Sequence, residues 1–190
     1  MTISEYRNYT TLKKEFDLKI FMVETTKRNY SVGIILSPDN DVLFQKKGRG
    51  YPWANSESWT KEDGIWTPSS NIKYYFGLFG GGMKEGETPQ TTFAREKKEE
   101  GLELLSGEAK PFLSQEFAER TDTKKREGII NYSVVRFNGN IKNFRDKEAA
   151  GLVLACEDEI RGYFGKLVFQ PNLKAVLKLY ESLKEGIFEV

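Results

Sequence analysis

Four glutamates and one arginine in the stretch GGGMKEGETPQTTFAREKKEE, residues 80–100, have the side chains and the spacing of a metal site. Glu87 precedes Arg95 and Glu96, and Glu99 and Glu100 follow directly along the same predicted helix. Residues three and four apart share a helix face, so three of these glutamates would point to one side. Such like charges repel by roughly a few tenths of a kcal/mol per pair. A divalent cation would turn this repulsion into attraction.

The glycines before the helix fit the same hypothesis. Residues 80–82 are all glycine, so the backbone can approach closely and offer a carbonyl oxygen as a further ligand. Arg95 is expected to pair with Glu87 and to tie this loop to the helix. The alternative is a solvated acidic face beside Lys97 and Lys98, because acidic helix turns are common on protein surfaces.

Two features of the composition narrow the chemistry. The chain has no histidine and one cysteine, Cys156. This excludes Ser-His-Asp and Cys-His nucleophile systems, imidazole metal sites, internal disulfides and thiolate zinc clusters. A metal here must therefore be a hard cation with oxygen ligands, Mg²⁺ first and Mn²⁺ as the alternative. The general base is expected to be a carboxylate, a lysine or a tyrosine.

Length and charge indicate the class of protein. The chain has 190 residues and a formal net charge of +1. This length suits one domain over 1–190, in which 1–28 form an N-terminal extension. The charge balance gives no argument for nucleic-acid or membrane-surface binding. No apolar run approaches a membrane span, and the first ten residues lack a secretory signal pattern, so a cytoplasmic protein is expected.

Apolar periodicity and turn residues predict a mixed sheet with helices packed on it. Strands are expected at 16–24, 30–36, 42–47, 74–79, 112–120, 128–137 and 150–155, with turns at 37–41 and 121–125. Short helical segments are expected at 4–15 and 156–164. The two main helices are expected at 89–100, with Thr88 as N-cap, Pro89 at its first position and Gly101 after its end, and at 170–186.

Residues 48–73 are expected to form a long insertion loop before the glycines. This segment holds all three tryptophans, among them Trp53 and Trp66. A loop of such length in a compact domain usually carries function or moves. Its aromatic side chains would either stack on a substrate base or anchor the loop to the core or to a second subunit of a homodimer.

The stretch around the glutamates resembles the Nudix box, G-x5-E-x7-R-E-U-x-E-E-x-G-U, in which U is apolar. Six positions fall in register, and they are Gly81, Glu87, Arg95, Glu96, Glu99 and Glu100. Two departures stand out. Lys97 occupies the first apolar position, and Gly101 follows the last glutamate directly, one residue early. Neither departure removes a carboxylate.

The resemblance implies a Nudix α/β/α sandwich of the α+β class, with the Nudix helix and a C-terminal helix on a mixed sheet. It also implies a hydrolase that cleaves a nucleoside diphosphate linked to another group. By analogy Glu99 and Glu100 bind the metal, and Glu96 binds metal or acts on the attacking water. The Gly80 carbonyl is a further ligand, while Gly81, Glu87 and Arg95 are structural.

Other segments are similar to the family as well. Lys46 and Lys47 stand where related proteins often carry a basic pair that touches phosphate, although solvated edge-strand lysines are the alternative. In KEAAG, Glu148 is the candidate for an additional acidic ligand or base, with Glu157 and Glu159 as rivals. Asn172 is the candidate for contact with a purine edge, or else the N-cap or a residue near the start of a helix.

Resemblance to MutT-like members favours a nucleoside triphosphate as substrate, cleaved to a nucleoside monophosphate and pyrophosphate. A nucleoside diphosphate sugar or a dinucleotide is the second hypothesis. A Nudix-fold module that binds a nucleotide without cleaving it is the alternative of another class. Such modules usually lose glutamates of the box, whereas this chain has all of them.

Overall fold

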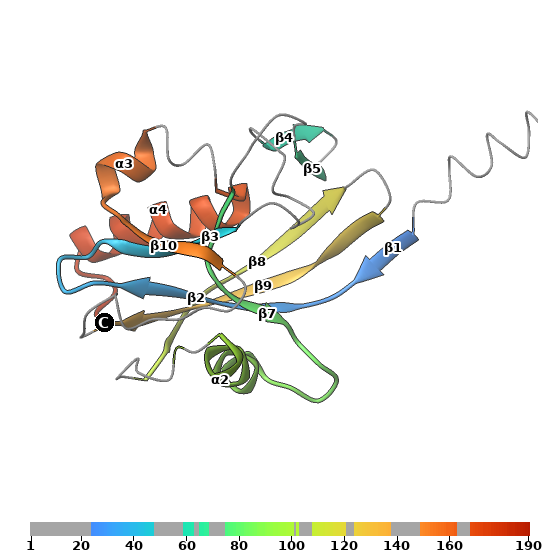
Figure 1. Cartoon of the computed structure of the whole chain (residues 1–190), viewed down its shortest axis with the longest axis horizontal. Helices are drawn as coiled ribbons and strands as arrows, with labels where there is room; N and C mark the ends of the chain where they lie inside the picture. The colour runs from blue at the N-terminus through green and yellow to red at the C-terminus, as the bar shows by residue number, and fades with distance from the viewer. Residues whose placement is uncertain are drawn as a thin grey trace, which may run out of the picture.

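A computed structural model gives the fold of the chain (Figure 1). The structure describes residues 24–47, 59–62, 65–68, 75–100, 102, 108–120, 124–137, 149–162 and 168–190. The strand expected at 16–24 lies outside these residues except for its last position, and so does the short helix expected at 4–15.

The described strands join in one mixed sheet, and their order across it is β10-β3-β2-β9-β8-β5-β4. In addition, β1 pairs with β9, β6 with β3, and β7 with β2. The strands are β1 Glu24–Lys27, β2 Tyr30–Leu36, β3 Val42–Lys47, β4 Trp59–Glu62, β5 Ile65–Pro68, β6 Tyr75–Gly77, β7 Phe79–Gly82, β8 Lys110–Arg120, β9 Lys124–Arg136 and β10 Ala149–Ala155.

Helices cover both faces of this sheet (Figure 1). On one face lies α2, Pro89–Glu99, and on the other lie α3, Glu157–Arg161, and α4, Gln170–Lys184. This arrangement confirms the expected α+β class and the helix–sheet–helix sandwich.

Alternation along the central strand β2 divides the core into two layers. Val32, Ile34 and Leu36 belong to the apolar cluster under α4, whereas Ile35 belongs to the cluster under α2. This follows from the two-residue period of a strand, which sends neighbouring side chains to opposite faces. Gly33 has no side chain because the Phe93 ring of α2 fills that position.

The structure corrects three of the expected elements. Residues 48–73 are not one irregular loop, because β4 and β5 form an antiparallel hairpin within them. The expected strand 74–79 is divided at Leu78, and β7 continues through the glycines to pair with β2. Lys124 and Lys125 lie in β9 rather than in a turn. In each case the pairing between strands determines the observed structure, and a local sequence pattern does not reveal which strands pair.

No helix among the described residues is long and apolar enough to cross a membrane.

Candidate active site on helix α2

Helix α2 begins where the sequence predicts. Thr88 has extended backbone angles, φ −90° and ψ 164°, and its Oγ1 accepts from the Thr91 N–H at 3.2 Å. In return Thr91 Oγ1 accepts from the Thr88 N–H at 2.9 Å, which completes a reciprocal cap. Pro89 stands at the first helical position, where no N–H is needed. The cap fixes the register of the glutamates that follow.

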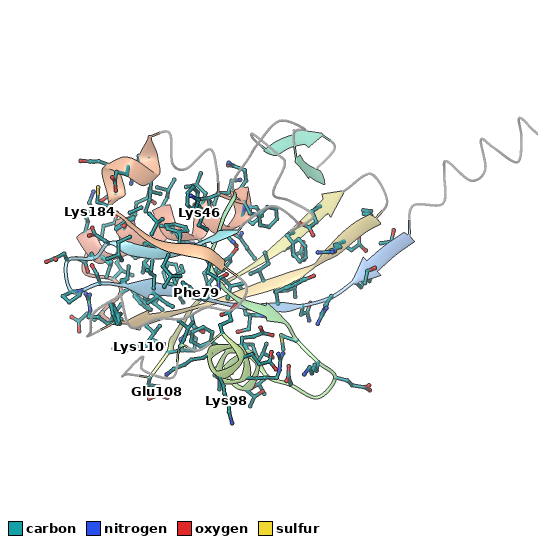
Figure 2. The ribbon with its side chains drawn as sticks, in the orientation of Figure 1. Lys46, Phe79, Lys98, Glu108, Lys110 and Lys184 are labelled. Carbon is teal, nitrogen blue, oxygen red and sulfur yellow. The ribbon has the colours of Figure 1, made fainter. Side chains whose placement is uncertain are left out.

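The start of the helix is held to the sheet by apolar packing and by a hydrogen bond from β2. Phe93 and Phe79 are buried in the same cluster, and Figure 2 shows Phe79 between the sheet and α2. Ser31 on β2 is fully buried and donates from Oγ to the Pro89 carbonyl at 2.7 Å. This bond joins the first turn of the helix to the central strand.

Arg95 is the centre of the acidic cluster. Its Nε donates to Glu87 Oε1 at 2.8 Å, and one Nη2 hydrogen bond reaches Glu87 Oε2 at 3.1 Å. Its Nη1 donates to Glu96 Oε1 and to Glu99 Oε2, the latter at 3.1 Å. Its Nη2 also donates to the Gly82 carbonyl at 3.1 Å. All five N–H donors of the guanidinium are thus engaged. Arg95 therefore offsets the electrostatic repulsion among Glu87, Glu96 and Glu99.

Glu87 is firmly held as an anion. Besides Arg95, its Oε2 accepts from the Lys84 backbone N–H at 2.8 Å and from Thr92 Oγ1 at 2.9 Å. Hydrogen bonding to Arg95, then to Lys84, lowers the pKa of Glu87 to about 2. The same contact with Glu87 raises the pKa of Arg95. The expected pairing of these two residues is present, and it ties the loop to the helix.

Glu96 lies against the glycine segment. A Cβ atom on Gly81 would overlap its carboxylate, so the absence of a side chain at Gly81 makes this contact possible. Gly80 has φ +136°, and a Cβ there would overlap the Ser31 carbonyl of the neighbouring strand. Both glycines are therefore required, the first by the close approach of Glu96 and the second by backbone conformation.

Glu99 and Glu100 face different surroundings. The side chain of Glu99 is 55% exposed and forms an ion pair with Arg95. Glu100, in contrast, is buried, with 7% of its surface exposed. Gln45 on β3 is fully buried and donates from Nε2 to Glu100 Oε1 at 3.2 Å. A buried carboxylate is costly without such a donor. Gln45 thus holds Glu100 toward the sheet.

The donor set is chemically suited to a hard divalent cation, because carboxylate and carbonyl oxygens are the ligands that Mg²⁺ and Mn²⁺ take. Because Gly81 has no side chain, the Glu96 carboxylate can lie directly beside the backbone at this position. The arrangement is not preassembled, however. Among the described residues, no three acidic side chains lie close enough together to hold an ion as they stand. In this arrangement Arg95 binds Glu96 and Glu99, and Gln45 binds Glu100.

The other predicted residues are only partly within the described structure. Glu148 and Trp53 lie outside the described residues, and the side chains of Lys47 and Trp66 are not described. Lys46 follows Gln45 on β3 and therefore faces the opposite side; Figure 2 shows it on the α4 side of the sheet. A phosphate bound by Lys46 would lie on that side.

Asn172 is the third residue of α4, and the N-cap of this helix is Phe169. Asn172 is buried, and its Oδ1 accepts from the Tyr132 hydroxyl at 2.9 Å. Gln115 donates to the same hydroxyl at 3.3 Å and to the Pro171 carbonyl at 2.8 Å. Asn172 is therefore part of a buried polar network near the start of the helix, which is the position that the alternative expected, although it is not the N-cap itself.

The rivals of Glu148 have local partners on α3, on the face of the sheet opposite α2 (Figure 1). Glu157 Oε1 accepts from Arg161 Nε and from Lys184 Nζ, both at 2.8 Å. Hydrogen bonding to Lys184 lowers the pKa of Glu157. Glu159 Oε2 accepts from the Cys156 N–H at 2.9 Å and closes the helix start. The structure does not bring these two carboxylates to α2.

Sequence reasoning missed Gln45 and Ser31. Each is a polar residue next to apolar residues of its strand, Ser31 before Val32 and Gln45 after Phe44, at a position that faces α2. A buried polar group needs a partner, and this interruption of the apolar pattern was the available signal.

Comparison with known proteins gives one family and a set of shared folds. The NUDIX domain family matches residues 27–172 of the chain. No curated protein matches the sequence. The solved structures that resemble it include the MutT protein of Methanosarcina mazei Go1, with 14% identity, 85% of this chain and 98% of that chain covered, and a TM-score of 0.55.

Two further structures are similar to the chain. One is a mutT/nudix family protein from Listeria innocua, with 16% identity, 84% and 96% of the two chains covered, and a TM-score of 0.55. The other is a bifunctional NMN adenylyltransferase/ADP ribose pyrophosphatase from Francisella tularensis, with 14% identity, 92% and 46% covered, and a TM-score of 0.52. These likenesses show the fold, and the family match spans most of the chain, which therefore belongs to the Nudix family of hydrolases.

Proposed function

We propose that the protein is an Mg²⁺-dependent Nudix pyrophosphohydrolase that cleaves a nucleoside triphosphate to a nucleoside monophosphate and pyrophosphate, with Mn²⁺ as an alternative ion. The observation that carries this proposal is the joint placement of the box carboxylates. Arg95 gathers Glu87, Glu96 and Glu99 beside the glycine segment, and Gln45 holds Glu100 on the same helix.

Glu96, Glu99, Glu100 and the Gly80 carbonyl would hold the ion, with Glu148 as an additional acid. A bound Mg²⁺ would neutralise phosphate charge and lower the pKa of a water from 15.7 toward roughly 7–9. Glu96 and Glu99 are available for this role once Nη1 of Arg95 releases them, while Nε and Nη2 keep Glu87 in place. Glu96 then accepts the proton of the attacking water, a step worth about 10²–10⁴ in rate.

Substrate contacts are proposed for residues outside the Nudix box. Lys46 and Lys47 bind phosphate, Trp53 or Trp66 stacks on the base, and Asn172 contacts its polar edge. Stacking of this kind is worth about 1–3 kcal/mol per base. Asn172 would make this contact through its Nδ2 group, because its Oδ1 accepts from the Tyr132 hydroxyl.

The organisation proposed for the chain is one Nudix domain over 1–190, in which 1–28 extend the N-terminus and 48–73 form an insertion. The last residues of this extension form β1, which pairs with β9 and so belongs to the sheet. We also propose a cytoplasmic location and a homodimer as the assembly.

A panel of nucleoside triphosphates, nucleoside diphosphate sugars and dinucleotides tests the proposed function. Release of phosphate or pyrophosphate is measured with Mg²⁺, with Mn²⁺ and with EDTA. We expect metal-dependent release that is greatest for a triphosphate, and a loss of about 100-fold or more in Glu99→Gln. Glu181→Gln is the matched control, because Glu181 is an exposed helical glutamate on α4. Equal activity of Glu99→Gln and the wild type would refute the metal assignment.

The second function, hydrolysis of a diphosphate sugar or dinucleotide, has the same chemistry and is distinguished by the order of rates in that panel. The alternative of another class is a module that binds nucleotide without turnover. It predicts saturable nucleotide binding with no metal-dependent release from any panel member.

A further inference from the structure

Arg28 lies in the short link between β1 and β2 and is fixed there at both backbone and side chain. Its N–H donates to the Glu127 carbonyl at 3.0 Å, and the carbonyl of the next residue, Asn29, accepts from the Met83 N–H at 2.8 Å. Its Nη2 donates to the Gly82 carbonyl at 3.3 Å, and its guanidinium carbon is 5.8 Å from the centroid of the Tyr30 ring.

Two glycines make room for this arginine. A Cβ on Gly82 would overlap the guanidinium, and a Cβ on Gly128 would overlap the Arg28 carbonyl. An arginine side chain carries about 2 kcal/mol of rotamer entropy, which opposes a fixed position. Arg28 is nevertheless exposed and held by a carbonyl and a ring. The fold therefore orients a cationic group at its surface.

Arg28 and Arg95 meet at the same backbone atom but differ in their charge balance. Both donate to the Gly82 carbonyl. Arg95 is neutralised by three carboxylates, whereas Arg28 forms no ion pair with any carboxylate in the described part of the chain. Among the described residues, no carboxylate therefore competes with an anion for the N–H groups of Arg28 that do not reach Gly82, and the planar guanidinium matches phosphate geometry.

The position of this guanidinium relates it to the candidate active site. Gly81 and Gly82 are neighbours on β7, and the first contacts Glu96 while the second contacts Arg28. Because neighbouring residues of a strand face opposite sides, Arg28 lies across β7 from the acidic helix. A substrate whose phosphates extend past the glycine segment would meet the proposed ion on one side and Arg28 on the other.

We propose that Arg28 binds a phosphate group of the nucleotide substrate and so positions it across the glycine segment. This inference rests on the proposed function and adds to it a binding residue outside the Nudix box.

The test compares Arg28→Gln and Arg28→Lys with Lys27→Gln as matched control. Lys27 is adjacent and exposed, but it pairs with Glu127 at 3.5 Å. Steady-state kinetics are measured on the best panel substrate, together with the Kd of its non-hydrolysable α,β-methylene analogue by calorimetry. We expect KM and Kd to rise about 10- to 100-fold in Arg28→Gln, the range for a lost charged hydrogen bond. Arg28→Lys should recover part of the loss, kcat should change by less than about 3-fold, and Lys27→Gln should match the wild type.

A second variant separates binding from folding. Gly82→Ala keeps the charge of Arg28 but displaces its guanidinium, so it should raise KM and Kd in the same direction as Arg28→Gln. The inference is overturned if KM and Kd stay within about 2-fold of wild type, if kcat alone falls, or if Lys27→Gln has an equal effect. Failure of the proposed function is a different result, namely a wild-type protein that cleaves no panel member. The analogue Kd still tests Arg28 in that case.

Discussion

Gln45 on β3 donates its side-chain amide to Glu100 at the end of α2 across 3.2 Å, and both residues are buried. A fully buried amide weakens the core unless it forms a hydrogen bond with another polar group. Here that group is a carboxylate of the Nudix box. The pair therefore connects the packing of the sheet to the chemistry proposed for the helix.

Gln45→Leu should weaken metal binding. Leucine keeps the approximate volume but removes the donor that orients Glu100, and loss of such an outer contact typically costs about 10- to 100-fold in metal affinity. The measurement is the Kd for Mn²⁺ by calorimetry or electron paramagnetic resonance. Gln90→Leu, at an exposed position of α2, is the control and should bind as the wild type does. An unchanged Kd in Gln45→Leu would show that Gln45 has no part in orienting a ligand.

Arg95→Lys should destabilise the fold by roughly 2–3 kcal/mol, because lysine cannot replace five planar donors and charged hydrogen bonds are worth about this much. Urea unfolding in EDTA measures the loss. The deficit should shrink with saturating Mn²⁺, since a cation can also neutralise Glu96 and Glu99. Arg161→Lys is the control: the Arg161–Glu157 pair is a surface i,i+4 contact, expected to change stability by less than about 1 kcal/mol. A deficit that is the same in both variants would contradict the central role of Arg95.

Glu119 on β8 should make stability depend on pH. Burial raises its pKa from 4.5 to about 7, and Arg126 at 3.5 Å offsets this only in part. The folded state therefore keeps the proton to higher pH than the unfolded state. Stability is full below about pH 4.5 and falls as pH rises through about 7, by roughly 3 kcal/mol in total.

Glu119→Gln cannot ionise and should remove this dependence. Relative to wild type, its free energy of unfolding should increase between pH 4.5 and pH 8, as measured by urea unfolding at both values. Glu116→Gln, at an exposed position of the same strand, should leave the slope unchanged. If the difference between Glu119→Gln and wild type is the same at both pH values, folding does not raise the pKa of Glu119.

Gly81→Ala should reduce turnover with little loss of fold. The added methyl group would occupy the place of the Glu96 carboxylate, which must then move from the glycine segment. We expect kcat to fall by about 10²–10⁴, the range for a lost general base. Circular dichroism should show a folded protein, because no backbone atom is among the nearest contacts of that Cβ. Wild-type kcat in this variant would rule out a role for Glu96 at its observed position.

The sequence by itself determined the local features of this protein. The reciprocal cap at Thr88, the start of α2 at Pro89 and the ion pair of Glu87 with Arg95 all depend on residues within a few turns of one another. The strands at 30–36 and 42–47 follow from apolar runs and a turn. The Nudix box lies within one such local segment, and its match identified the family before any fold was known.

Only the tertiary structure determined which side chains bind the glutamates and which residues lie next to them. Arg95 pairs with Glu87, Glu96 and Glu99, and Glu99 and Glu100 face solvent and sheet respectively. Gln45 reaches Glu100 across 55 residues of sequence, and Arg28 reaches Gly82 across 54. Such contacts depend on strand order and register, which are set by the packing of the whole sheet and have no counterpart in any local pattern of residues.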